Sequence, residues 1–103
     1  MPAVTALAPE SAGPAELAGA GATLRRVAVK AGHAATRHHH GFEQFLFVAS
    51  GRGRLECEAG GIALEPGTAL RLEPGAWHSA EFTADTVLIE VNLAPAETLN
   101  RRP

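Results

Sequence analysis

The sequence predicts an all-β fold, either a sandwich or a barrel built from short strands. From Thr23 onward, short apolar runs alternate with Gly and Pro residues of the kind that form turns. Residues 54–58 also alternate in polarity, with Leu55 and Cys57 on one face and charged side chains on the other. A period of two residues is that of a half-buried strand, so both observations indicate β-structure.

The chain has 103 residues, which is enough for one domain with a single core. Its net charge is −2 and its Lys and Arg residues form no basic block, which argues against a nucleic-acid-binding protein. No apolar run approaches the roughly 20 residues that cross a bilayer, and the N-terminus lacks a signal-peptide pattern. Because Cys57 is the single cysteine, it has no intramolecular disulfide partner, and we expect a cytoplasmic protein without a membrane partner.

The composition divides the chain into three regions. Residues 1–22 are rich in Ala, Gly and Pro, and we predict a flexible arm there, with a short helix around Pro14–Ala18 as the alternative. Residues 23–95 form the predicted β-domain and residues 96–103 a C-terminal tail. A tight hairpin turn is expected at Gly60–Gly61. The expected strands, each given with the turn that closes it, are 24–32, 45–53, 54–61, 62–67, 68–75 and 85–93.

The segment GHAATRHHHGFEQ, residues 32–44, carries side chains that bind metals. On a strand, His38 and His40 would point to the same face, about 6–7 Å apart, and two such imidazoles can converge on one ion. Gln44 and Glu43 follow within reach of the same centre. They have opposite parity on the next strand, and the pattern alone leaves open which of them faces inward.

The other histidines differ in whether they are expected to reach the same site. His39 has the opposite parity from its two neighbours, so we expect it to face outward. His33 stands beside Gly32 and is expected to face solvent. His78, in PGAWHSAEF, is far from Gln44 in the sequence, so only the fold can bring it to the same site.

Two segments resemble the conserved motifs of the cupin superfamily. Residues 32–51 are similar to the first motif, G-x5-H-x-H-x3-E-x6-G, if Gln44 takes the glutamate position. Residues 67–82 are similar to the second motif, G-x5-P-x-G-x2-H-x3-N. They depart from it at Glu73, which replaces the first proline, and at Phe82, which replaces the final asparagine. The order and separation of the two motifs are fairly specific for a fold and poorly specific for a function.

The resemblance covers about residues 24–93 and implies an antiparallel jelly-roll β-barrel that commonly forms a homodimer. It also implies a divalent metal ion inside the barrel, either Fe, Mn, Ni or Zn. We expect Glu43 at the rim, where it would hydrogen-bond a metal-binding histidine or act as a catalytic base. Phe42 and Trp77 flank the implied ligands, and we expect them to form either an apolar wall of the pocket or part of the core. The implied metal ligands are His38, His40, Gln44 and His78.

This resemblance favours a small metal-dependent enzyme that acts on an oxygen-rich small molecule by isomerisation, cyclisation or dioxygenation. Two alternatives stay open. The first is a non-catalytic module that binds a sugar or another small molecule. The second is a metal-independent sugar-nucleotide isomerase in which histidines act as acid and base. A tyrosine cannot be the acid in such an enzyme here, because the chain contains no Tyr.

Overall fold

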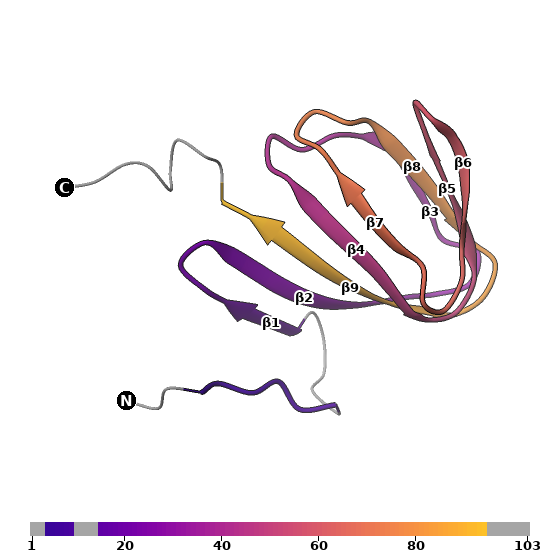
Figure 1. Ribbon diagram of the computed structural model, residues 1–103. Helices are drawn as coiled ribbons and strands as arrows, with labels where there is room; N and C mark the ends of the chain where they lie inside the picture. The colour runs from indigo at the N-terminus through magenta and orange to yellow at the C-terminus, as the bar shows by residue number, and fades with distance from the viewer. Residues whose placement is uncertain (1–3, 10–14, 95–103) are drawn as a thin grey trace.

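Two antiparallel β-sheets face each other in the computed structural model, which describes residues 4–9 and 15–94 (Figure 1). One sheet has five strands in the order β1-β2-β9-β4-β7, and the other has four in the order β3-β8-β5-β6. The strands of the described residues are β1 (Ala15–Ala18), β2 (Ala22–Val29), β3 (Ala34–His38), β4 (Gln44–Ser50), β5 (Gly53–Cys57), β6 (Gly60–Leu64), β7 (Ala69–Leu72), β8 (His78–Phe82) and β9 (Thr86–Leu93). The predicted all-β fold is confirmed. In the described part of the chain, no helix has the length and apolar character needed to cross a membrane.

Strand β4 shows which parity of the sequence faces the interior. Gln44 is 6% exposed, Leu46 is 7% and Val48 is 0%, whereas Phe45 and Phe47 are 41% and 44% exposed. The inward side chains meet those of the opposite sheet, and this contact removes apolar surface from water. The buried apolar cluster between the sheets consists of Leu46, Val48, Leu55, Leu64, Phe82 and Leu88.

Strand β9 lies in the middle of the five-stranded sheet, where it pairs with β2 on one side and β4 on the other. In these registers Asn92 is opposite Gln44 and Glu90 is opposite Leu46, while Arg25 of β2 is opposite Glu90. Directly opposed residues on neighbouring strands point to the same face of a sheet. The pairing therefore sends three polar side chains of β2 and β9 into the interior beside Gln44.

Two local predictions were wrong. Ala15–Ala18 forms neither a flexible arm nor a helix, because it pairs antiparallel with β2 across a turn in which Gly19 N donates to Ala22 O at 2.8 Å. The hairpin between β5 and β6 turns at residues 58–59 rather than at Gly60–Gly61. Both glycines belong to β6 and pair with β5. The predicted tail at 96–103 lies outside the described residues.

Gly51 closes β4 at a point where a side chain does not fit. Its φ is 102°, in the region that L side chains rarely adopt, and an added Cβ would overlap Thr86 Oγ1. Thr86 is 2% exposed and its hydroxyl donates to Ala84 O at 2.8 Å. Gly51, the last glycine of the first motif, is therefore required because the turn after β4 packs closely against the start of β9 at Thr86.

Candidate metal centre

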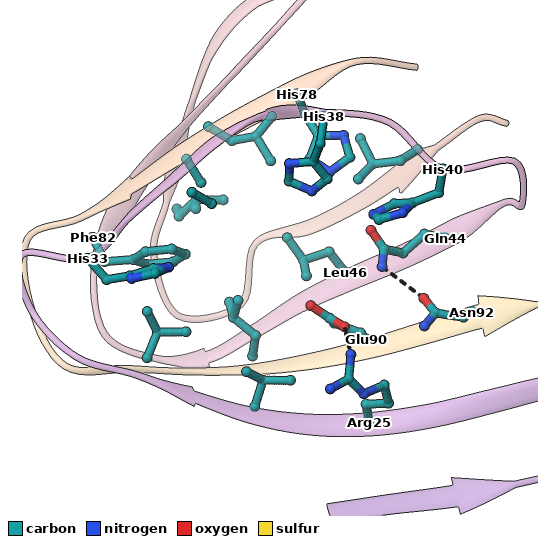
Figure 2. Close-up of a pocket in the computed structure, with 18 of the residues that line it drawn as sticks. Arg25, His33, His38, His40, Gln44, Leu46, His78, Phe82, Glu90 and Asn92 are labelled. Carbon is teal, nitrogen blue, oxygen red and sulfur yellow. Dashed lines mark hydrogen bonds and ion pairs between the residues drawn. The ribbon is translucent and has the colours of Figure 1, made fainter. Parts of the chain in front are cut away.

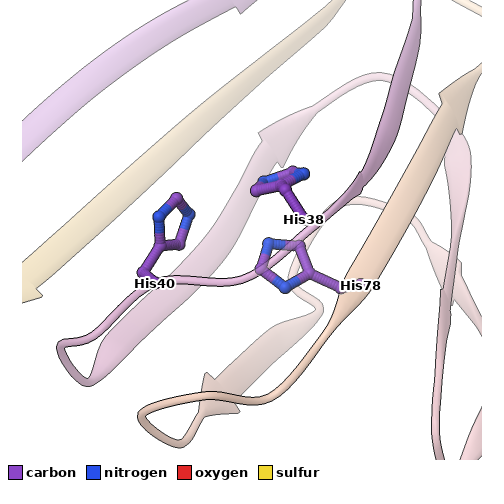
Figure 3. Close-up of side chains that lie close together, drawn as sticks. All are labelled: His38, His40 and His78. Atoms are coloured by element: carbon purple, nitrogen blue, oxygen red, sulfur yellow. The ribbon is translucent and has the colours of Figure 1, made fainter.

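Three imidazoles converge at one end of the space between the sheets (Figure 3). Ring nitrogens of His38, His40 and His78 all lie within 4.8 Å of one another. The ring centroids are 4.3 Å apart for His38 and His78, 5.0 Å for His38 and His40, and 5.5 Å for His40 and His78. Residues separated by 40 positions thus form one cluster.

The backbone explains this convergence. His38 ends β3 and His78 begins β8, and the two residues are directly paired in the register of these strands. His40 lies beyond the end of β3, so the expected single strand carrying both His38 and His40 does not extend that far. A hydrogen bond from Gly75 N to His40 O at 2.8 Å instead ties the loop of the first motif to the turn before β8.

Backbone carbonyls orient two of the rings. Nδ1 of His38 lies 2.6 Å from Thr36 O, and Nδ1 of His78 lies 3.1 Å from Ala76 O. A carbonyl oxygen only accepts hydrogen bonds, so in each pair Nδ1 carries the proton and donates it. The lone pair of each ring is then on Nε2, which is the arrangement of a metal-binding imidazole held by a second hydrogen bond.

Burial favours the neutral form of the more enclosed rings. It lowers the pKa of His40, and the neighbouring His38, His78 and His39 lower it further. Burial also lowers the pKa of His78, although its hydrogen bond to the Ala76 carbonyl opposes this. Metals bind the neutral imidazole, so both shifts maintain these two rings in the form that an ion requires.

Gln44 lines the same cavity from the facing sheet. Its Nε2 donates to Asn92 Oδ1 at 2.8 Å, and its Oε1 then points toward His40 (Figure 2). Three imidazole nitrogens and one amide oxygen suit Fe, Mn, Ni or Zn. Nitrogens bound to one such ion lie roughly 3.0–3.4 Å apart, given bonds of about 2.1 Å. Small rotations of the three rings would meet this requirement, so the residues present fit a divalent metal ion.

Of the other predicted site residues, Phe42 lies at the cavity, whereas Trp77 and Glu43 lie outside it. Phe42 lines the cavity and stacks on His40, with ring centroids 4.9 Å apart and an angle of 14° between the planes. Trp77 lies outside this cavity, with the Arg37 guanidinium carbon 4.1 Å above its ring. Glu43 points to the outer face of the sheet and forms an ion pair with Arg71.

A cavity of about 350 Å³ continues from the histidines into the barrel (Figure 2). Its deeper walls are mainly apolar. His33, expected to face solvent, is exposed but lines the far end and stacks on Phe82 at a centroid distance of 6.3 Å. The apolar side chains that line the cavity include Val27, Val29, Leu46, Leu55, Leu64 and Leu88.

The sequence reasoning missed an acidic group in this cavity. Glu90 lines the wall, and its Oε1 lies 3.4 Å from Arg25 Nη1. Burial raises the pKa of Glu90, while Arg25 and His38 oppose the shift. The signal was present in the strand alternation, since Glu90 and Asn92 share the parity of the buried Leu88.

Comparisons with known proteins agree with this architecture. The family model described as "Cupin domain" matches residues 25–92. A cupin protein from Bacteroides fragilis superimposes with a TM-score of 0.77 at 19% identity, covering 93% of this chain and 88% of that one. KdgF from Halomonas sp. gives a TM-score of 0.69 at 19% identity, covering 87% and 89%. Ectoine synthase from P. lautus gives 0.72 at 18% identity, covering 84% and 67%.

A curated relative is longer than this chain. The "Probable transcriptional regulator LumQ" of Photobacterium leiognathi is 30% identical over 60 residues, which are 58% of this chain and 24% of that protein. The chain thus spans about a quarter of the length of this relative. The family match over residues 25–92, together with the fold that solved cupins share, shows that the chain belongs to the cupin family.

Proposed function

We propose that this cupin binds a divalent metal ion through His38, His40, His78 and Gln44 and uses it to act on an oxygen-rich small molecule. The observation that carries the proposal is the cluster of three imidazoles within 4.8 Å, with the Gln44 side chain lining the same cavity. A bound ion would act as a Lewis acid that polarises a carbonyl or hydroxyl oxygen, or as a redox centre if it is Fe, Mn or Ni. Isomerisation, cyclisation and dioxygenation all use this kind of chemistry.

The chain's own residues supply the remaining functions of such an enzyme. Phe42 and the apolar walls exclude water from the inner part of the cavity. Glu90 is the carboxyl group that lines this cavity among the described residues, so we propose Glu90, rather than Glu43, as the acid or base that holds a proton there. Arg25 beside it holds the carboxyl group in place.

Metal content and turnover test this proposal together. The untagged protein, loaded with Fe(II), Mn(II), Ni(II) or Zn(II) and then dialysed, should retain about one ion per chain by elemental analysis. The loaded protein should convert at least one member of a panel of hydroxy acids, oxo acids and sugars, and a chelator should abolish this activity. Retention of no ion at all, or equal turnover in the presence of chelator, would contradict the metal-dependent function. Activity in chelator on a nucleotide-linked sugar would instead favour the metal-independent isomerase.

A non-catalytic binding module is the second candidate. It is favoured by the 30% identity to part of a protein named as a transcriptional regulator, in which the matched segment is 24% of the length. In that case the loaded protein would bind a member of the same panel by calorimetry without converting it. The cytoplasmic location remains a prediction from the sequence.

We also propose that a second copy of the chain covers the outer face of the five-stranded sheet. Phe45 and Phe47 are 41% and 44% exposed there, and they pair in register with Val91 and Ile89 of β9. These four side chains form a contiguous apolar surface on neighbouring strands. Contiguous exposed apolar surface of this kind marks contact sites between proteins.

A further inference from the structure

The charge of the cavity wall is low for a site that holds a divalent ion. The ionisable side chains that line it are Arg25, Glu90 and four histidines, His33, His38, His40 and His78. Imidazoles that bind a metal are neutral, and the negative charge of Glu90, when that group is ionised, is already offset by the adjacent Arg25. The positive charge of a bound ion is therefore not compensated by these walls.

The amide pair Gln44–Asn92 is the reason why the cavity wall carries no net negative charge. Gln44 stands where the first cupin motif has a glutamate, and it is 6% exposed, so water does not screen this position well. Its Nε2 is used by Asn92 Oδ1 at 2.8 Å, which leaves its oxygen toward His40 (Figure 2). Two neutral amides thus occupy a place where one carboxylate would have neutralised half of the charge of the ion.

Acidic groups near the cavity do not replace that carboxylate. Glu16 lies 3.2 Å from Arg25 Nε, but its side chain is 50% exposed and it is outside the cavity lining. Glu43 is neutralised by Arg71 on the outer face of the sheet. Solvent screens both groups more strongly than it screens charges inside the barrel.

We propose that the metal-loaded cavity selects small anionic ligands that bind through oxygen, such as 2-hydroxy and 2-oxo carboxylates, and that Asn92 is the positioning residue that keeps the Gln44 carbonyl oxygen toward the ion. This inference rests on the proposed metal-binding function. The ligand carboxylate supplies the negative charge that the protein omits. The apolar walls around Leu46 and Leu88 accept the uncharged part of the ligand within the 350 Å³ available.

Glycolate and glycolamide are the probes that test the selection. They have nearly the same shape, and both offer a hydroxyl and a carbonyl oxygen, but glycolamide is uncharged. A carboxylate is the better ligand for a free ion as well. The decisive quantity is therefore how the ratio of the glycolate affinity to the glycolamide affinity changes between the wild-type protein and its variants. Calorimetry on the Mn(II)-loaded proteins measures this ratio.

Three substitutions and one control give distinct expectations. Gln44→Glu should bind Mn(II) more tightly and lower the glycolate/glycolamide ratio roughly fivefold or more, which is the effect of one charge at about 4 Å even in water. Asn92→Asp still accepts the Gln44 Nε2 hydrogen bond, so it should keep the ion and lower the ratio in the same direction. Asn92→Leu should weaken Mn(II) binding about 10- to 100-fold. Ala63→Glu adds the same charge at an exposed position of β6 and should change neither quantity.

The outcomes separate this inference from the proposed function. An unchanged ratio in both Gln44→Glu and Asn92→Asp, with Mn(II) bound, would overturn the anion selection alone. Wild-type Mn(II) affinity in Asn92→Leu would overturn the role of Asn92. Absence of any bound divalent ion in the wild-type protein would overturn the proposed function and this inference with it. If Gln44→Glu does not fold, Asn92→Asp still measures the ratio with one added charge.

Discussion

Metal binding at the three histidines should stabilise the folded protein, and the substitution His78→Ala should remove most of this stabilisation. Of the proposed ligands, His78 is the one to test, because it is 6% exposed and its strand pairs directly with β3 at His38. Alanine at this position keeps the backbone pairing and deletes only the ring. The ring faces a cavity that already exists, so the protein without metal should lose little stability.

The size of the effect follows from linkage. At a free ion concentration of about 100 times Kd, binding to the folded state alone stabilises it by roughly 2.7 kcal/mol. In a domain of about 100 residues each kcal/mol moves Tm by about 4–8 °C, so the ion should raise Tm of the wild-type protein by about 10–20 °C. Loss of one of four ligands should cost about 3 kcal/mol, if roughly 10 kcal/mol of ion affinity is shared among them. That loss brings Kd near the ion concentration, and the Tm shift then falls to about 2–3 °C.

Thermal unfolding followed by circular dichroism, with and without Zn(II) or Mn(II), measures both shifts. His39→Ala is the matched control, because His39 is an exposed neighbour outside the cluster and its variant should keep the full shift. An equal shift in wild type and His78→Ala would refute the assignment of His78 as a ligand. A shift lost in His39→Ala but kept in His78→Ala would place the ion elsewhere.

Three further predictions address pH, packing and assembly. Burial lowers the pKa of His78 below 6.5 in the folded protein, so the unfolded chain binds more protons as the pH falls through this value. Tm of the metal-free protein should therefore decrease between about pH 7 and pH 5, and the decrease should be smaller in His78→Ala; identical pH profiles would contradict this. Leu64 is 1% exposed, so Leu64→Ala should lower the free energy of unfolding by about 2–5 kcal/mol in urea titrations, and a change under about 1 kcal/mol would show that the core is loose there. Phe47→Asp should convert a dimer into a monomer in sedimentation experiments with little change in metal affinity, whereas a wild-type monomer would end the proposed role of the outer face.

The strand pattern of the sequence predicts most of the fold and much of the candidate site. Alternation in residues 54–58 indicates which face of that strand is buried, and the apolar runs at 45–48 and 85–93 indicate further strands without showing which face is buried; these properties are local to each strand. The arm was predicted wrongly because its composition favours no local structure, and pairing with β2 decides the conformation of Ala15–Ala18. A strand of four residues depends on its partner for its hydrogen bonds, so propensity alone is a weak guide.

Motif spacing and turn glycines are features of single segments, and they predict an all-β cupin with His38, His40 and His78 as candidate metal ligands. The motif spacing implies Gln44 rather than Glu43 as the inner residue, but only the tertiary structure shows which of the two side chains faces the interior. It does so through the register of β4 with β9, which places Gln44 opposite Asn92 and leaves Glu43 with Arg71 on the outer face. It also placed Trp77 outside the cavity and brought Glu90 into it. Each of these outcomes depends on which strand lies next to which, and strand neighbours are set by long-range packing that no single segment encodes.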